Sequence, residues 1–542
     1  MPEKCYIVSK GIVEMNIERK AIELWSKEAR RAGIIGPTGF DAAAAGAAND
    51  AAAQLLYTQS VKPKDGAVFV LLKMPGVSRK EPGFAWDRVL GIFGPSAAFA
   101  GFQGEVVEIE GGASALFAAL THANALSLRR ALPFTAPSPL ADREITFGVG
   151  DRLGVAGAGH LRVMKRYRAA PVLAQQSVRE LDLTGRDYEQ VLDASTWAVF
   201  QEGYEQPWGA DGDHLKSEEW VRTAVTIGYT MITADVSDYI RKEFDTADDA
   251  RIAEAYAGLE EEYRRRIEER YLSLEMALDT GEKISFTKEA LARTALVYGR
   301  AIEHGVRLYR AGVEVKGEGS FDFELSVDET ETPTTAEAHL FVALEAGEAG
   351  MKISSLAPRF VGEFQKGIDY IGDLQEFERT FATHAALARK LGYRISVHSG
   401  SDKFSAFPVV GRLTRGCFHL KTAGTNWLEA VKIMAMEEPA LYRRLHRAAL
   451  DRFGKATSYY HVTTNLDNVP PLAELSDADL PGLFDNADSR QLIHITYGEL
   501  LRDPEIGEPF FAALHEHIEE YWQALERHIG RHLETLGVGA AQ

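Results

Sequence analysis

Between residues 144 and 436, short apolar runs alternate with longer amphipathic runs eight times, and this alternation constrains the fold more than any other feature. Without a hairpin signal between them, such strand-helix units favour a parallel sheet. Eight units are also the number that closes a (β/α)8 barrel of the TIM type. We therefore expect an α/β fold with such a barrel, and an open doubly wound sheet is the alternative. The expected strands are 144–149, 171–176, 206–211, 229–235, 321–328, 351–356, 393–398 and 417–423.

Three further regions surround the expected barrel. Residues 1–140 have mixed patterns that favour an N-terminal α/β accessory domain, with strands at 68–74 and 105–110 and a helix over 113–132. The barrel domain is expected over 141–436, with a helical insertion at 240–312, where apolar residues recur every three or four positions. Residues 437–542 are expected to form a mainly helical C-terminal extension, interrupted by two pieces with strand character at 459–464 and 492–496.

Charge and composition limit the partners of the chain. Of 542 residues, 79 are acidic and 60 basic, which gives a formal charge of −19. A field of that sign repels phosphate backbones and anionic lipid, so we expect neither nucleic-acid nor membrane-surface binding. A small anionic substrate stays compatible, because a few local cations can govern one pocket. A homo-oligomer also stays compatible with the composition.

The cysteine content and the N-terminus favour a cytoplasmic protein. Two cysteines, Cys5 and Cys417, cannot form a disulfide framework and fit a reducing compartment. No apolar run reaches the length of about 18 residues expected of a membrane span. The first residues also lack a basic segment followed by an apolar stretch, so we expect no secretory signal.

Polar groups follow nearly every expected strand, which is where barrel enzymes place their active sites. His214, Glu329 and His398 come after three of the apolar runs. Imidazole plus carboxylate suits a divalent metal ion such as Zn, Mn or Ni. Taken singly, His214 could instead cap a helix and Glu329 could pair with a lysine. The three positions together predict a metal site.

Other strand-end groups are candidates for proton transfer or substrate binding. Asp213, Asp235, Lys216 and Lys421 are candidate catalytic residues, although a lone lysine is more often a solvated surface side chain. A sugar acid would need cations for its carboxylate, which an arginine fork can supply. For Arg152 and Arg359, ion pairs across the barrel mouth are the alternative. The candidate substrate-binding residues at the strand ends are Arg152, Gln175, Arg359 and Lys403.

Four sequence strings together resemble the tagaturonate/fructuronate epimerase family. They are Gly-Asp-Arg-Leu-Gly at 150–154, Gly-Ala-Asp-Gly-Asp-His-Leu-Lys at 209–216, His-Ser-Gly-Ser-Asp-Lys-Phe at 398–404 and Gln-Leu-Ile-His-Ile-Thr-Tyr-Gly at 491–498. The last string adds His494 to the candidate substrate-binding residues. The likeness covers roughly residues 140 to 500 and implies an epimerase that links D-tagaturonate and D-fructuronate. Some relatives are associated with 4-epimerisation of the neutral ketohexoses tagatose and fructose.

The residues fit a metal-dependent retro-aldol epimerisation. The inverted carbon bears a hydroxyl β to the ketone, so its C–H bond is not acidic and simple deprotonation cannot invert it. Cleavage and religation of the adjacent C–C bond, assisted by a Lewis-acidic metal, can do so. Transient oxidation by a nicotinamide is the other route, for which the sequence lacks a convincing fingerprint.

Two other classes of function stay open at the level of the sequence. A class II aldolase or a metal-dependent ketose isomerase would use the same barrel and ion. A non-catalytic sugar-binding barrel subunit is the alternative outside enzymes, and the many titratable strand-end groups weigh against it. Serine hydrolase chemistry has no support, because the Gly-x-Ser-x-Gly elbow is absent from the sequence.

Overall fold

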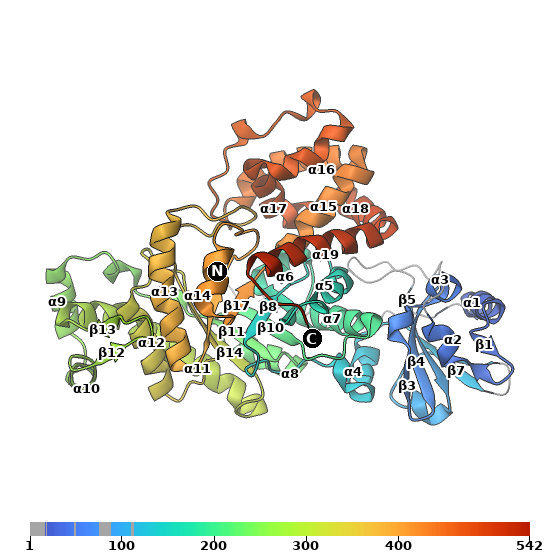
Figure 1. Ribbon diagram of the computed structural model, residues 1–542, viewed down its shortest axis with the longest axis horizontal. Helices are drawn as coiled ribbons and strands as arrows, with labels where there is room; N and C mark the ends of the chain where they lie inside the picture. The colour runs from blue at the N-terminus through green and yellow to red at the C-terminus, as the bar shows by residue number, and fades with distance from the viewer. Residues whose placement is uncertain (1–16, 18, 48–49, 75–87, 110–112, 542) are drawn as a thin grey trace, which may run out of the picture. The chain divides into compact units, whose positions relative to one another are not determined.

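The computed structural model describes residues 17, 19–47, 50–74, 88–109 and 113–541. The chain divides into two compact units. One lies within residues 1–133 and takes in 200–203, and the other comprises 134–199 and 204–542. Figure 1 labels most of the helices and strands of both units.

The larger unit contains a closed barrel of eight parallel strands, as the alternation of the sequence predicted. The final strand closes the barrel on the first, with Phe418 opposite Ile145 and Lys421 opposite Gly148. Strands covered on both faces need apolar side chains throughout, which explains the continuous apolar runs. The strands are β8 (Ile145–Gly148), β9 (Ala170–Ser177), β10 (Gly209–Leu215), β11 (Met231–Asp235), β14 (Asp322–Val327), β15 (Ser355–Pro358), β16 (Arg394–Val397) and β17 (Phe418–Lys421).

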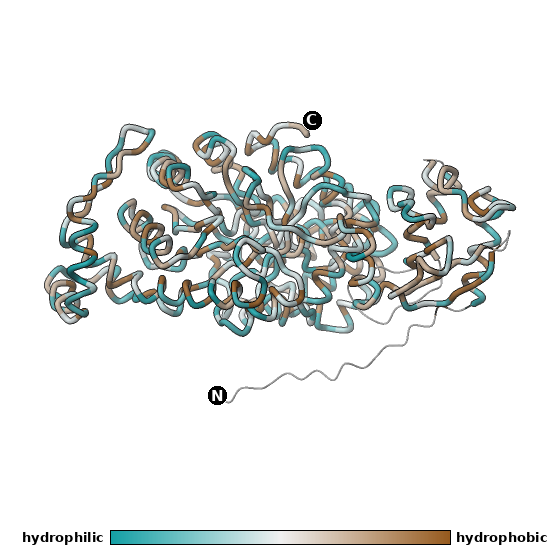
Figure 2. Tube along the Cα trace, turned by 90° about the horizontal axis from the view of Figure 1, so that it is seen from below, coloured by the Kyte–Doolittle hydropathy of each residue, from teal (hydrophilic) through white to brown (hydrophobic). Residues whose placement is uncertain are grey.

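Helices follow the strands and surround the barrel (Figure 1). Side-chain caps fix where several begin: Ser217 accepts from Trp220 N, and Thr335 accepts from Ala338 N. Along the helices, hydrophobic and hydrophilic residues alternate, as amphipathic segments on a barrel require (Figure 2). These helices are α5 (Gly157–Met164), α6 (Val178–Thr184), α7 (Tyr188–Glu202), α8 (Glu218–Ile227), α12 (Ala336–Glu348), α13 (Leu374–Leu391), α14 (Phe407–Thr414) and α15 (Thr425–Glu437).

The insertion between β11 and β14 is mainly helical and also contains a small hairpin. Helices α9 (Asp249–Ala257) and α10 (Glu261–Tyr271) precede the antiparallel pair β12 (Glu275–Ala277) and β13 (Lys283–Ser285). The hairpin was not expected, because its strands are three residues long and mostly exposed, which leaves little apolar pattern. The 29-residue helix α11 (Lys288–Lys316) then returns to the barrel, where it packs against α8 and α12.

The C-terminal extension forms α16 (Pro439–Ala456), α17 (Ala487–Leu501), α18 (Pro504–Glu516) and α19 (Ile518–Thr535). The prediction of two strand-like pieces was wrong. Residues 459–464 have no regular structure, and 492–496 lie inside α17. Residues 491–498 of α17 are all buried, so the helix has no polar side that would distinguish its sequence from a buried strand.

The smaller unit contains a five-stranded antiparallel sheet, in the order β3-β4-β5-β7-β6. The prediction of one helix over 113–132 was wrong, because β7 pairs with β5 and β6 before Thr121 caps α4 (His122–Ala131). Pairing with neighbouring strands here overrides the helical propensity of Ala and Leu. The strands are β3 (Lys62–Lys64), β4 (Ala67–Lys73), β5 (Arg88–Gly94), β6 (Glu105–Glu108) and β7 (Ser114–Ala118).

Two other features of the sequence have structural counterparts. Within the described part of the chain, no helix combines the length and apolar character that a membrane crossing requires. Cys417 is a half-buried free thiol, and Cys5 lies outside the described residues.

Two glycine substitutions of opposite expected sign test how the end of α19 packs on the barrel helix α14. A Cβ on Gly411 in α14 would lie 1.9 Å from the carbonyl oxygen of Leu536, whereas one on Gly454 in α16 would meet nothing within 4 Å. We expect Gly411→Ala to lower the free energy of unfolding by about 1–3 kcal/mol. Gly454→Ala should raise it by about 0.5–1 kcal/mol, because alanine favours helix. Urea unfolding of both variants checks this, and equal effects would contradict it.

Candidate active site

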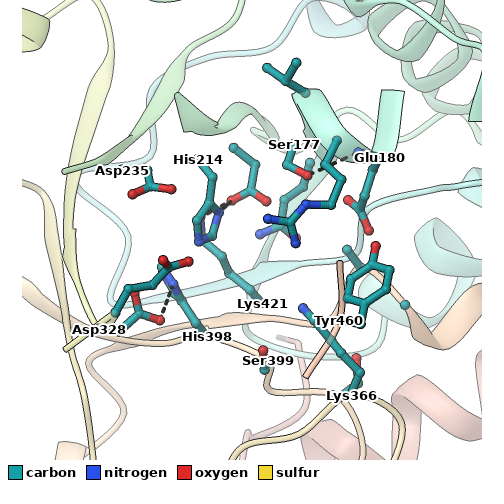
Figure 3. Close-up of a pocket in the computed structure, with 18 of the residues that line it drawn as sticks. Ser177, Glu180, His214, Asp235, Asp328, Lys366, His398, Ser399, Lys421 and Tyr460 are labelled. Carbon is teal, nitrogen blue, oxygen red and sulfur yellow. Dashed lines mark hydrogen bonds and ion pairs between the residues drawn. The ribbon is translucent and has the colours of Figure 1, made fainter. Parts of the chain in front are cut away.

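A pocket of about 460 Å³ opens at the carboxyl ends of the barrel strands (Figure 3). Its walls come from the ends of several strands and from the loops that follow them, as in other (β/α)8 enzymes. Many of its lining groups are ionisable. Among them are Glu180, Asp213, His214, Lys216, Asp235, Asp328, Glu329, Lys366, His398 and Lys421.

Lys421, at the end of β17, is the cationic centre of the barrel interior. Its Nζ lies 2.9 Å from Asp211 Oδ2, 2.6 Å from Asp213 Oδ1 and 3.0 Å from Glu324 Oε1. Burial lowers the pKa of Lys421, but the three carboxylates outweigh it and hold the pKa well above its usual value. The ammonium is therefore a fixed charge that neutralises buried acids.

His214 lies beside this cluster and is oriented by one of its carboxylates. The Nδ1 atom of His214 is 2.9 Å from Asp213 Oδ1, so Nε2 is the ring nitrogen that Asp213 does not contact. His214 has φ 55°, a left-handed conformation that non-glycine residues adopt rarely. Such backbone strain is often found at functional sites, where the surrounding contacts hold it in place.

His398 lies between two carboxylates just after β16. Its Nε2 is 2.7 Å from Glu324 Oε1, and its Nδ1 is 3.2 Å from Asp328 Oδ2 (Figure 3). Burial lowers the pKa of His398, but the carboxylates of Asp328 and Glu324 raise it to about 9. The buried Nδ1 atom has no hydrogen bond of good geometry within the described chain. A cation beside Asp328 would satisfy this nitrogen.

His214, Asp328 and His398 form a compact group with donor atoms within 4.8 Å of one another. Two imidazoles and one carboxylate are a donor set that suits divalent transition metals. Asp213 and Glu324 contact the other nitrogen of each ring, an arrangement that orients metal-binding histidines in proteins. The residues present therefore fit a divalent metal ion.

Glu329 lies next to this group in the sequence. It lines the pocket but is exposed, whereas Asp328 is half-buried and contacts His398. The loop after β14 thus directs Asp328, and not Glu329, toward the two histidines. Sequence reasoning missed Asp328 because two acidic residues in succession give no signal for which one points inward.

Asp235 and Lys216 form a second pair at the pocket wall. Asp235 ends β11, and its Oδ1 accepts a hydrogen bond from Ser237 N. Its Oδ2 lies 3.6 Å from Lys216 Nζ, which also donates to Asp238 Oδ1 and Ser237 Oγ. Lys216 is about half exposed and can exchange protons with solvent.

Gln175 and Arg152 occupy different positions relative to the pocket. Gln175 lines it, and both atoms of its buried amide are without hydrogen-bond partners in the described residues. Gly148 makes room for this amide, since a Cβ there would lie 2.3 Å from Gln175 Oε1. Arg152 is buried behind the pocket, where it donates twice to Glu180 Oε1 at 2.6 and 2.8 Å and stacks on Tyr497.

The remaining predicted binding residues are engaged by the protein's own groups and do not line the pocket. Arg359 donates to the carbonyl of Thr330. Lys403 Nζ donates to the carbonyls of Gln365, Ile368 and Ser401. His494 projects from α17 against backbone, because a Cβ on Gly367 or Gly424 would lie 2.9 or 2.2 Å from its ring. In this structure these side chains shape the loops around the site.

Asp211 and Glu324 were also missed by sequence reasoning. Both lie inside strands, where they point into the barrel and contact Lys421. A signal existed, because an acid within an apolar run such as Phe-Asp-Phe-Glu-Leu-Ser at 321–326 is costly unless a buried cation compensates it.

A second histidine-carboxylate cluster links the loop after β16 to α19. His528 Nε2 lies 2.7 Å from Asp402 Oδ1, and Arg490 from α17 lies 2.9 Å from Asp402 Oδ2. Neighbouring His532 accepts from Asp402 N and donates to His528 O, so both of its ring nitrogens are already used. This cluster is therefore a structural tie between loop and helix, with no nitrogen of His532 left for a metal.

Comparison with known proteins agrees with this site. A family model described as tagaturonate epimerase matches residues 57–536. A tagaturonate/fructuronate epimerase of Thermotoga maritima is 41% identical over 485 residues, which are 89% of this chain and 96% of that protein. The native crystal structure of fructuronate-tagaturonate epimerase UxaE from Cohnella laeviribosi has 44% identity and a TM-score of 0.84, covering 90% of this chain and 98% of that one. Its complex with one glycerol has 45% identity, the same TM-score and the same coverage.

The fold and the strand-end site together define an enzyme of the (β/α)8 barrel class. The extent of these matches makes the assignment more specific. The chain belongs to the tagaturonate epimerase family, as the four sequence strings indicated, and is an enzyme of the isomerase class. A non-catalytic sugar-binding subunit is thereby set aside.

The tie between Asp402 and His528 should make stability depend on pH. Burial lowers the pKa of His528, but Glu429 and Asp402 outweigh it and raise the pKa, while Arg490 opposes them. Since the folded pKa is raised, the stabilisation is full below the unfolded value of about 6.5 and is lost as pH rises through the folded pKa. Unfolding free energies of wild type and His528→Gln should therefore differ most at acidic pH and converge at alkaline pH. Urea titrations across this range check the trend, and a pH-independent difference would contradict it.

Proposed function

We propose that this enzyme interconverts D-tagaturonate and D-fructuronate by inverting the hydroxyl-bearing carbon β to the ketone. The printed names of its relatives in Thermotoga maritima and Cohnella laeviribosi support this substrate pair. The observation that carries the proposal is the pocket that joins His214, Asp328 and His398 to the Asp235–Lys216 pair. In this proposal a candidate cation-binding group lies beside a candidate base and a candidate acid.

The residues that would hold a divalent metal ion are His214, Asp328 and His398. Zn, Mn and Ni all accept this donor set. When bound, such an ion supplies Lewis-acid stabilisation of negative charge on the substrate oxygens next to the bond that breaks. Asp213 and Glu324 hold the two imidazoles in the orientation that ligation needs.

Retro-aldol cleavage solves the chemical problem of this inversion. The C–H bond at the inverted carbon is not acidic, but its hydroxyl proton can be removed. The electron pair of that O–H bond then forms a carbonyl, while the bond to the neighbouring carbon breaks and its electrons enter an enediolate. After the aldehyde turns its other face to the enediolate, the same bond forms again and the alkoxide regains its proton.

Asp235 is our candidate for the base that removes the hydroxyl proton. Its Oδ2 is directed toward Lys216, whereas Oδ1 is held by Ser237 N. Asp213 is less suited to the task, because its Oδ1 already contacts both His214 and Lys421. Asp213 therefore orients the imidazole.

Lys216 and Lys421 divide the cationic roles. Lys421 stays protonated and fixed among carboxylates, so it stabilises the site and does not transfer a proton. Lys216 is half exposed beside Asp235. Burial lowers the pKa of Lys216, but Asp238 and Asp235 outweigh burial and raise the pKa, so the side chain holds its proton. It is our candidate for the acid that returns a proton to the alkoxide, a far stronger base, and it can regain that proton from solvent. Gln175, with an unpartnered amide in the pocket, is our candidate for binding substrate hydroxyls.

D-tagatose and D-fructose are further candidate substrates. They differ from the sugar acids at the terminal carbon of the sugar, and not at the carbons that react. The same residues could therefore epimerise them, with a weaker hold on the substrate where the carboxylate is missing.

A matched pair of variants tests the metal site. Asp328→Asn should reduce metal bound per chain at least tenfold, because it removes the carboxylate that closes the donor group. Glu329→Gln should keep its metal, since Glu329 is the exposed neighbour. Metal analysis of the purified, dialysed proteins checks both. Loss of metal in Glu329→Gln but not in Asp328→Asn would assign the ligand to Glu329.

An isotope experiment tests the activity and its route together. Purified enzyme given D-tagaturonate should form D-fructuronate, as followed by NMR. Deuterium at the inverted carbon should give no primary kinetic isotope effect, since the C–H bond there stays intact. A large primary effect would indicate transient oxidation, and solvent deuterium beside the ketone in every product molecule would indicate isomerase chemistry. Absence of fructuronate would overturn the proposed function.

A further inference from the structure

A sugar acid needs a cation for its carboxylate, and the three cations predicted for this role are occupied. Arg152 is paired with Glu180, and Lys403 donates to three backbone carbonyls. Arg359 binds the carbonyl of Thr330 and does not line the pocket. Lys421 is saturated by carboxylates. The cation for the substrate must come from elsewhere in the pocket.

Lys366 is a cation that lines the pocket and is not engaged in this way. It lies in the loop between β15 and α13, and its side chain is half-buried. Among the residues that the structure describes, none forms a hydrogen bond or an ion pair with its Nζ. Burial lowers the pKa of Lys366, and Arg152 and Arg179 add to this effect against Glu180 and Asp213. A bound anion would relieve this destabilised charge.

The backbone around Lys366 is held in place by side chains from outside the loop. Lys403 Nζ donates to the carbonyls of Gln365 and Ile368 on either side of it. From α17, Arg490 Nε donates to Gly367 O at 2.8 Å, and Gln491 Nε2 donates to Lys366 O at 3.3 Å. The backbone from which Lys366 projects is thus held in place before substrate arrives, which lowers the cost of ordering this loop on binding.

The charged groups differ between the two sides of the pocket. In Figure 3, Lys366 and Tyr460 lie on the side of the pocket away from Asp235 and Asp328, with Lys421 between the two sides. Arg179, which is exposed and lines the same wall, lies 5.6 Å from the centre of the Tyr460 ring and uses one nitrogen, Nη1, to donate to Tyr459 O at 3.2 Å. The end that would hold a metal carries Asp235 and Asp328. The opposite end carries Lys366 and Arg179 together with Glu180, whose carboxylate is paired with the buried Arg152.

We propose that Lys366 binds the substrate carboxylate, assisted by Arg179, and so sets the preference for a sugar acid over a neutral ketose. This rests on the proposed function, because it assigns the far end of the substrate within the same pocket. Lys366 is a binding residue in this assignment and takes no part in proton transfer.

Kinetics on paired substrates test the assignment. For Lys366→Gln, KM for D-tagaturonate should rise about 10- to 100-fold, the range expected for a lost charge-assisted hydrogen bond, with kcat changed less than threefold. Its kcat/KM for D-tagatose should stay within threefold of wild type. Lys366→Arg should recover most of the loss on tagaturonate. Equal losses on both substrates, or a fall in kcat alone, would make Lys366 a proton carrier and overturn the proposal.

The control is Lys390→Gln. Lys390 is an exposed lysine in the last turn of α13, close in sequence to the start of β16 and thus at the opposite rim of the barrel from the pocket. This variant removes one positive charge without touching the pocket, so its KM for tagaturonate should equal that of wild type. A similar rise in KM for Lys390→Gln would show that the loss of a positive charge far from the pocket has the same effect, and this would overturn the proposal.

Binding measured without turnover separates this proposal from the proposed function. Isothermal calorimetry compares the aldonate D-gluconate with the neutral D-glucitol on the same protein. Wild type should bind gluconate at least tenfold more tightly, and Lys366→Gln should lose this difference. If the protein is inactive on tagaturonate but shows this binding pattern, the proposed carboxylate site stands and the proposed function is overturned. Equal affinities for the two ligands in wild type, or no binding of either, would overturn the site.

Discussion

The structure of the site depends on the neutralisation of three buried carboxylates by the ammonium of Lys421. Asp211, Asp213 and Glu324 come from two different strands and would repel one another inside the barrel without it. With their charge compensated, Asp213 and Glu324 can each hold an imidazole in a fixed orientation. One cation at the end of the last strand therefore prepares a donor group that extends over three other strand ends.

The rigidity of the site comes largely from outside the barrel. His214, Ser399 and Asp402 have left-handed backbone conformations, at φ 55°, 49° and 63°, in the segments that end β10 and follow β16. Such conformations persist where neighbours hold them. For Asp402 these neighbours are Arg490 on α17 and His528 on α19. The C-terminal helices thus hold the loop that begins at His398.

Much of the fold was predictable because a parallel barrel buries both faces of each strand, which leaves apolar runs that are easy to recognise. The largest displacements were in the third and sixth strands, expected at 206–211 and 351–356 but observed as Gly209–Leu215 and Ser355–Pro358. The third contains Asp211, Asp213 and His214, so the functional residues themselves break the strand pattern. Partners distant in sequence could not be predicted: nothing local indicates that Arg152 faces Glu180 or that Lys403 binds the loop of Lys366.

The C-terminal extension has a consequence for how this protein matures in the cell. Ribosomes complete the eight strands before they make α17 and α19, and domains generally fold as they emerge. The helices that hold the loops after β15 and β16 through Arg490, Gln491 and His528 are thus made after the barrel strands. A nascent barrel can close before these helices exist, yet the loops after β15 and β16 gain these contacts only once α17 and α19 have been made.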